Sequence, residues 1–130
     1  AIFLDGTTTV VAAHSVLKSL EGELTTPLVT ILGVPQDRNF EGVYQVFAEV
    51  SDTLVLTETS INDKIRFPSE ATALATARRY HHDVHYARAL PDALEIARQK
   101  AGSRGTIILA VAQPLVGEAI QMWGVDMENI

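Results

Sequence analysis

The segment Ala1-Ile2-Phe3-Leu4-Asp5-Gly6-Thr7-Thr8-Thr9-Val10 begins with a short apolar run, continues with an acid and a glycine, and ends in three hydroxyl side chains. The apolar run is typical of a buried strand, and the hydroxyl residues are typical of the start of a helix. In open parallel sheets, ligands collect at the carboxyl ends of strands, where helix N-termini offer unpaired N–H groups. The segment therefore predicts a ligand-binding site at the edge of the sheet where the strands end, and it leaves the chemistry of that site open.

The size and composition of the chain indicate one ordinary globular domain. Its 130 residues are enough to bury a proper core, and 47% of them are hydrophobic. A net charge of −6 argues against a nucleic-acid partner, and no apolar run has the roughly 20 residues of a membrane span. The absence of cysteine excludes disulfides and thiolate chemistry and fits a cytoplasmic protein. Because the chain starts on a core strand without an initiating Met, we expect a single domain, residues 1–130, cut from a longer protein.

Strand and helix patterns alternate along the chain. Five apolar runs are typical of strands, and they cover residues 2–4, 28–32, 53–57, 84–87 and 106–112. Amphipathic segments with helical spacing follow each run. Continuous apolar strands joined by such helices predict an α/β, Rossmann-like fold, with a mostly parallel, doubly wound sheet of five to six strands and helices on both faces.

Several residues mark the expected helix boundaries. Asn39 and Ser69 are typical N-caps, Pro91 suits the first turn of a helix, and Gly102 is a typical stop signal. A last helix is expected after the fifth strand, and its apolar face would consist of Val116, Ala119, Ile120 and Trp123.

Parallel pairing would bring a defined set of polar residues to one edge of the sheet. The set comprises Asp5, Thr7, Thr8 and Thr9, then Gln36, Asp37 and Arg38, and then Glu58, Arg88 and Gln113. The alternative interpretation is that loops are simply polar, and that Asp5 and a threonine cap the first helix. The residues as a set favour a ligand site more than any single member does.

Several familiar chemistries are excluded at this edge. Phosphatases of the haloacid dehalogenase class need a nucleophilic aspartate where Phe3 stands. A response-regulator receiver needs an acid at the end of the third strand and a lysine after the fifth, where Thr57 and Ala112 stand. Neither G-x-G-x-x-G nor G-x-x-x-x-G-K-[ST] occurs, so nucleotide binding in the usual autonomous mode is not expected.

A histidine cluster, formed by His81, His82 and His85, raises the question of a metal site. His81 and His82 fall at a helix end, His85 enters a strand, and only Asp83 stands nearby to complete a ligand set. A solvated helix terminus is the favoured interpretation, because cationic side chains there interact favourably with the helix dipole. We expect no metal site and no catalytic residue in this chain.

In order along the chain, five segments resemble the C-terminal domain of the Mur ligase superfamily, and most of all folylpolyglutamate synthase/dihydrofolate synthase. Where that family has Asp-Gly-Ala-His-Asn-Pro after a strand, this chain has Asp5-Gly6-Thr7-Thr8-Thr9-Val10. The family's Leu-Gly-Val and Asp-Lys-Asp correspond to residues 32–39, and its Asn-Asp, Arg and Pro correspond to residues 62–68. A helix of the type Ala-Leu-x-x-Ala-Arg matches residues 93–98, and the last strand with its Gly-Glu matches residues 111–118.

The resemblance implies part of an ATP-dependent amide ligase, in which a carboxylate is activated as an acyl phosphate and attacked by an amino group, classically of glutamate. It implies ATP and Mg2+ as cofactors of the longer protein, with none held by the isolated domain. It also implies an upstream ATPase domain of the same chain as the partner, and an acidic, glutamate-like small molecule as substrate. We expect the isolated domain to be inactive.

The resemblance also assigns roles to particular residues. Asp5 takes the place of the aspartate that contacts the nucleotide ribose, and Asp37 with Arg38 would line the cleft. Thr7, Thr8 and Thr9, with their helix amides, would approach phosphate or an acidic substrate. These threonines replace Ala-His-Asn, so the motif is degenerate. A non-catalytic binding or assembly module that kept the ligase fold, and an unrelated small Rossmann-like binding protein, are the alternative interpretations.

Overall fold

Strands and helices alternate through the computed structural model, which describes residues 2–6, 9–58, 66–112 and 128–129. The elements are β1 (Ile2–Asp5), α1 (Val10–Ser19), β2 (Leu28–Gly33), α2 (Phe40–Ala48), β3 (Thr53–Thr57), α3 (Glu70–Arg78), β4 (Val84–Ala87), α4 (Leu90–Ala101), β5 (Thr106–Val111) and β6 (Glu128–Asn129). The five predicted strands are all present. The helix expected around Val116 lies outside the described residues.

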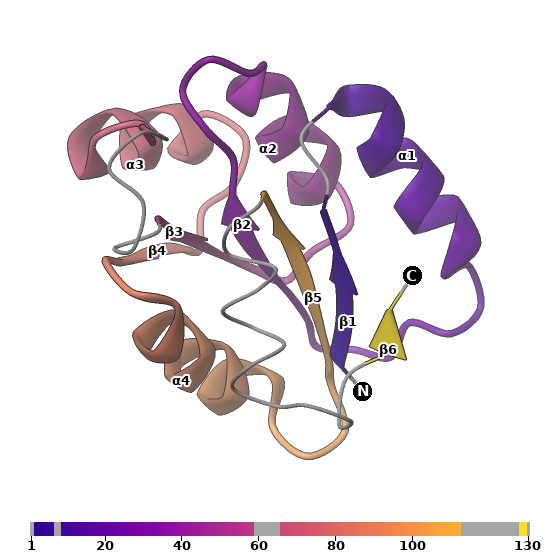
Figure 1. The fold of residues 1–130 in the computed structure, drawn as a ribbon. Helices are drawn as coiled ribbons and strands as arrows, with labels where there is room; N and C mark the ends of the chain where they lie inside the picture. The colour runs from indigo at the N-terminus through magenta and orange to yellow at the C-terminus, as the bar shows by residue number, and fades with distance from the viewer. Residues whose placement is uncertain (1, 7–8, 59–65, 113–127, 130) are drawn as a thin grey trace.

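The strands form one parallel sheet in the order β4-β3-β2-β5-β1-β6 (Figure 1). From β1 the chain moves outward through β2 and β3 to β4, and it then returns to place β5 between β2 and β1. Helices α1, α2 and α3 cover one face, and α4 covers the other (Figure 1). The predicted Rossmann-like, doubly wound arrangement is confirmed.

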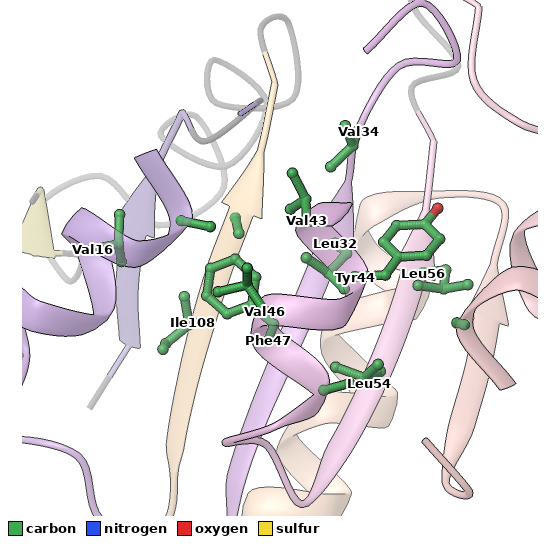
Figure 2. Close-up of a cluster of buried hydrophobic side chains, with 14 of the residues drawn as sticks. Val16, Leu32, Val34, Val43, Tyr44, Val46, Phe47, Leu54, Leu56 and Ile108 are labelled. Atoms are coloured by element: carbon green, nitrogen blue, oxygen red, sulfur yellow. The ribbon is translucent and has the colours of Figure 1, made fainter. Parts of the chain in front are cut away.

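Both faces of the sheet are buried, which explains why its central strands β2, β3 and β5 are mostly apolar. Leu54 and Leu56 of β3 pack into a core under α1, α2 and α3, whereas Val55 between them packs under α4. Side chains of successive strand residues point to opposite faces, so a strand covered on both sides needs apolar residues throughout. Phe47 of α2, with 0% of its surface exposed, belongs to the first core, part of which is drawn in Figure 2.

Among the helices in the described part of the chain, α1, α2 and α3 begin with a side-chain cap. The hydroxyl or amide oxygens of Thr9, Asn39 and Ser69 accept hydrogen bonds from the first-turn amides of α1, α2 and α3. Helix α4 begins with Leu90-Pro91 and has no side-chain cap, and it ends at Gly102, whose φ of 65° is in the left-handed region. The predicted boundaries at Asn39, Ser69 and Gly102 are confirmed.

The structure corrects one interpretation in the histidine cluster. His82 is exposed, as expected of a solvated helix end, but His81 is half-buried and both of its ring nitrogens are hydrogen-bonded. Its partners are the carbonyl of Ser51 and the amide of Asp83. His81 therefore serves tertiary structure rather than the helix dipole. In the part of the chain that the structure describes, no helix is long and apolar enough to cross a membrane.

Phe47→Ala tests the packing of the first core. Because the ring is fully buried, its loss leaves a cavity, and we expect the free energy of unfolding to fall by about 3–5 kcal/mol. Val11→Ala is the control, since 77% of Val11 is exposed, and its effect is expected to stay within about 0.5 kcal/mol. Urea unfolding followed by circular dichroism measures both changes. Equal losses in the two variants would contradict this packing.

Candidate ligand edge

The strand ends that carry the predicted site residues are level with one another. The last residue of β1, Asp5, pairs with Ala110 of β5, and the last residue of β2, Gly33, pairs with Val111. On the other side of β2, Thr57 of β3 is level with Ala87 of β4. Helices α1, α2, α3 and α4 begin at this edge, which we call the carboxyl edge, because each follows the end of a strand in a parallel sheet (Figure 1). The predicted convergence of strand ends is confirmed, while ligand binding there stays a prediction.

A glycine contact brings the start of α1 against the start of α2. A Cβ atom built on Gly42 would lie 2.6 Å from both Val10 Cγ2 and Asn39 Nδ2. Real Cβ atoms do not approach other heavy atoms so closely, so the two helices can meet here only because residue 42 lacks a side chain. Thr9 directly precedes Val10, and Asp37 with Arg38 directly precedes Asn39. The two predicted ligand segments are therefore neighbours in space.

Thr9 is the N-cap of α1. Its Oγ1 accepts a hydrogen bond of 3.0 Å from the amide of Ala12, and its carbonyl accepts one of 3.0 Å from Ala13. The capping interpretation is thus confirmed for Thr9, although its hydroxyl hydrogen can still be donated to a ligand. Asp5 ends β1 by its backbone, and Thr7 and Thr8 lie outside the described residues.

Asp37 and Arg38 lie in an exposed turn that is fixed by backbone hydrogen bonds. The amide of Arg38 donates to the carbonyl of Pro35 at 3.2 Å, and the amide of Gln36 donates to the carbonyl of Arg66 at 2.9 Å. Arg66 belongs to the connection between β3 and α3, so this bond ties two loops of the carboxyl edge together. Sequence reasoning did not place Arg66 at the site, although the Arg-Phe-Pro motif pointed to its loop.

Glu58 and Tyr86 form a pair that sequence reasoning missed. The Tyr86 hydroxyl on β4 donates to the Glu58 carboxylate, which directly follows β3. Burial raises the pKa of Tyr86, and the hydrogen bond to Glu58 and the charges of Glu58 and Glu70 raise it further, so the phenol stays protonated. Glu58 is therefore engaged by the protein. Arg88 is exposed after β4, and Gln113 lies outside the described residues.

The arrangement suits binding rather than covalent chemistry. Exposed guanidinium groups at Arg38, Arg66 and Arg88 follow three neighbouring strands, beside helix N-termini that carry partial positive charge. Among residues 2–6, 9–58, 66–112 and 128–129, no group of three His, Cys, Asp or Glu side chains could hold a metal ion. The described edge can therefore hold anionic groups, and its residues offer hydrogen bonds and charge.

Gly42→Ala tests the contact that brings the two segments together. In an ordinary helix this change would stabilise by about 1 kcal/mol, because alanine has the higher helix propensity. Here the new methyl group meets Val10 and the Asn39 cap, so we expect a loss of about 1–3 kcal/mol in urea unfolding. Val10→Ala in the same chain should recover part of that loss. A stabilised Gly42→Ala variant would show that α1 and α2 do not meet at this point.

Comparison with known proteins finds solved structures that have a similar fold. No protein-family model and no curated protein matches the sequence. A folylpolyglutamate synthase of Mycobacterium tuberculosis, solved with ADP and AMPPCP, matches with a TM-score of 0.78 and 25% identity over 98% of this chain and 30% of its own. Another structure of the M. tuberculosis enzyme, with ADP, matches with a TM-score of 0.81, 24% identity and the same coverages of 98% and 30%.

A third match is the bifunctional folylpolyglutamate synthase/dihydrofolate synthase of Yersinia pestis, solved with AMPPNP and a Mn ion. Its TM-score is 0.75 with 13% identity, over 93% of this chain and 28% of its own. The chain thus spans about a third or less of the length of each of these proteins. The resemblance predicted from the sequence is confirmed, since nearly the whole chain has the Rossmann-like fold found within folylpolyglutamate synthases and the bifunctional synthase.

Proposed function

We propose that this domain caps the nucleotide and the amino-acid substrate of a divergent ATP-dependent amide ligase that resembles folylpolyglutamate synthase. The observation that carries the proposal is the match over 98% of the chain, at 25% identity, to a folylpolyglutamate synthase solved with ADP and AMPPCP. In this proposal the domain is the C-terminal part of a longer cytoplasmic protein. An upstream ATPase domain of the same chain is its partner.

The nucleotide fits the side of the carboxyl edge that is formed by β1 and α1. Asp5 ends β1 and can accept hydrogen bonds from a ribose, as the resemblance implies. The first-turn amides of α1 and the hydroxyls of Thr7, Thr8 and Thr9 can donate to phosphate oxygens. Because the described residues contain no cluster of metal ligands, the proposal assigns Mg2+ to the ATPase domain.

The acidic substrate fits the neighbouring side of the same edge. Arg38 is exposed in a turn fixed by two backbone hydrogen bonds, and the contact at Gly42 sets this turn beside the start of α1. A guanidinium group there can hold a carboxylate by paired hydrogen bonds. Nucleotide and amino acid would therefore be held at adjacent helix starts, so that the amino group can reach the carboxylate that the nucleotide has activated.

The residues of this domain bind and orient the reactants and exclude water. ATP, when bound, supplies the phosphoryl group that activates the substrate carboxylate as an acyl phosphate. Threonine hydroxyls donate and accept hydrogen bonds but cannot act as bases near neutral pH. Because Thr8 stands where the family has histidine, this chain contributes binding and positioning to the reaction. The isolated domain is therefore proposed to be inactive.

Arg38→Ala in the longer protein tests the proposal. We expect amino-acid-dependent ATP hydrolysis to lose roughly 10- to 100-fold in kcat/KM, because a hydrogen bond to a charged group contributes about 1.5–3 kcal/mol. Arg104→Ala is the matched control, since Arg104 is also exposed but precedes β5 at the opposite edge of the sheet. Asp5→Ala is expected to raise the KM for ATP more than the KM for the amino acid.

Two results would count against this function. If both Arg38→Ala and Asp5→Ala kept wild-type turnover, the assigned residues would be wrong. If the longer protein hydrolysed no ATP with any amino acid tested, the alternative of a non-catalytic binding or assembly module with a ligase fold would be favoured.

A further inference from the structure

His81 joins two chain connections at the edge of the sheet opposite the carboxyl edge. Its Nε2 lies 2.7 Å from the carbonyl oxygen of Ser51, in the connection between α2 and β3. Its Nδ1 lies 3.0 Å from the backbone nitrogen of Asp83, just before β4. Ser51 and Asp83 are 30 and 2 residues from His81 in the sequence, so the ring holds the starts of β3 and β4 together.

The two contacts fix the protonation state of the ring. A carbonyl oxygen can only accept a hydrogen bond, so Nε2 must carry the hydrogen. A backbone N–H can only donate, so Nδ1 must be without one. Only the neutral Nε2–H tautomer satisfies both contacts. A proton added at Nδ1 would face the N–H of Asp83, and that hydrogen bond would be lost.

The connections that His81 joins are themselves anchored in the sheet. Ser51 hydrogen-bonds Thr30 of β2 through their hydroxyl oxygens at 2.7 Å. The carbonyl of Asp83 accepts from the amide of Leu54 at 3.0 Å, and its Oδ2 accepts from Thr53 Oγ1 at 2.7 Å. Strand β4 is an edge strand with β3 as its one neighbour. Loss of the His81 contact would therefore weaken the start of β4, which pairs with β3 over four residues.

The charges around His81 determine where a protonated ring would turn. Besides Asp83, the neighbours are the His82 ring, stacked at 4.9 Å, and Asp52, whose carboxylate accepts from the amide of Leu28 at 2.6 Å. The Asp83 carboxylate also contacts His85 at 2.8 Å and Lys100 of α4 at 3.6 Å. Burial would raise the pKa of Asp83, but the hydrogen bonds from Thr53 and His85 and the charges of His85 and Lys100 lower it on balance.

We propose that His81 is an acid-sensitive latch on β4. In the neutral form it holds the connection between α3 and β4 against the start of β3, through Ser51 and Asp83. On protonation the ring releases the Asp83 amide and turns toward the Asp83 carboxylate, so that this end of the sheet loosens. The latch is independent of the proposed ligase role, since it lies at the opposite edge from the candidate site.

The sign of the pH dependence follows from proton linkage. The latched state binds no proton at His81 and the unfolded chain binds one in acid, so the latch stabilises less as the pH falls. An unperturbed histidine takes up its proton near pH 6.5, so moving from about pH 7.5 to about pH 5.5 lowers the folding equilibrium constant roughly tenfold through this residue. His85 also contacts the Asp83 carboxylate, at 2.8 Å, and a change at residue 81 leaves both members of this pair in place.

His81→Gln separates the latch from the other titrating groups. The glutamine amide can donate to Ser51 and accept from Asp83 but does not titrate, so the variant keeps both contacts at either pH. Urea unfolding of the 130-residue chain at about pH 7.5 and at about pH 5.5 gives the folding equilibrium constant at each pH. We expect this constant to fall by a factor that is roughly ten times larger in the wild type than in His81→Gln. The His85 contribution is common to both and cancels. His14→Gln, at an exposed histidine of α1, should show the same pH dependence as the wild type.

Nuclear magnetic resonance of the imidazole nitrogens is a second measurement. It reports the tautomer of His81, which would not matter if the ring served only to fill space. His81 should show the Nε2–H tautomer at about pH 7.5, because only that tautomer satisfies both of its contacts. Amide hydrogen exchange in β4 should accelerate in acid in the wild type but not in His81→Gln. An Nδ1–H tautomer, or the same pH dependence in His81→Gln as in the wild type, would overturn the proposal.

Discussion

Parallel pairing of β5 with both β2 and β1 is the constraint on which the rest of the structure depends. Strand β5 comes after β1 and β2 in the sequence but lies between them in the sheet. Its register sets Asp5 opposite Ala110 and Gly33 opposite Val111. The ends of β1 and β2 are thereby placed at the same level, although they are far apart in the sequence. All six residues of β5 are buried, and the strand pairs with β2 on one side and with β1 on the other.

The packing of the helices determines which segments at the carboxyl edge lie next to each other. Helices α1 and α2 lie on the same face of the sheet, and the missing side chain of Gly42 lets their first turns meet. Thr9 and Arg38 are brought to one place by this contact, and the bond from Gln36 to Arg66 adds the loop after β3. The opposite edge is held by a different network around Asp83, so the two ends of the sheet differ in chemistry. Exposed arginines such as Arg38 lie at the carboxyl edge, and the hydrogen-bonded His81 lies at the opposite edge.

Local signals predicted most of the fold. Burial on both faces makes β2, β3 and β5 mostly apolar, so they stand out in the sequence. Asn39 and Ser69 can be identified as caps because capping needs only residues within one turn. The pairs that sequence reasoning missed are nonlocal. The partner of His81 is 30 residues away at Ser51, and Tyr86 meets Glu58 only because β3 and β4 are neighbours. For Thr9 the residue type suits both a cap and a ligand, and only the hydrogen bond to Ala12 shows that it caps.

The proposed function requires a nucleotide to bind at the start of α1, on the carboxyl edge of this sheet. Amide hydrogen exchange of the longer protein, with and without AMPPCP, tests it most directly, because each amide reports on its own position. With AMPPCP bound, we expect slower exchange at the first-turn amides of α1 and in the turn at Asp37 and Arg38, with no change at Ser51 and Asp83. Protection confined to the Ser51 and Asp83 edge, or the same exchange with and without nucleotide throughout this domain, would contradict it.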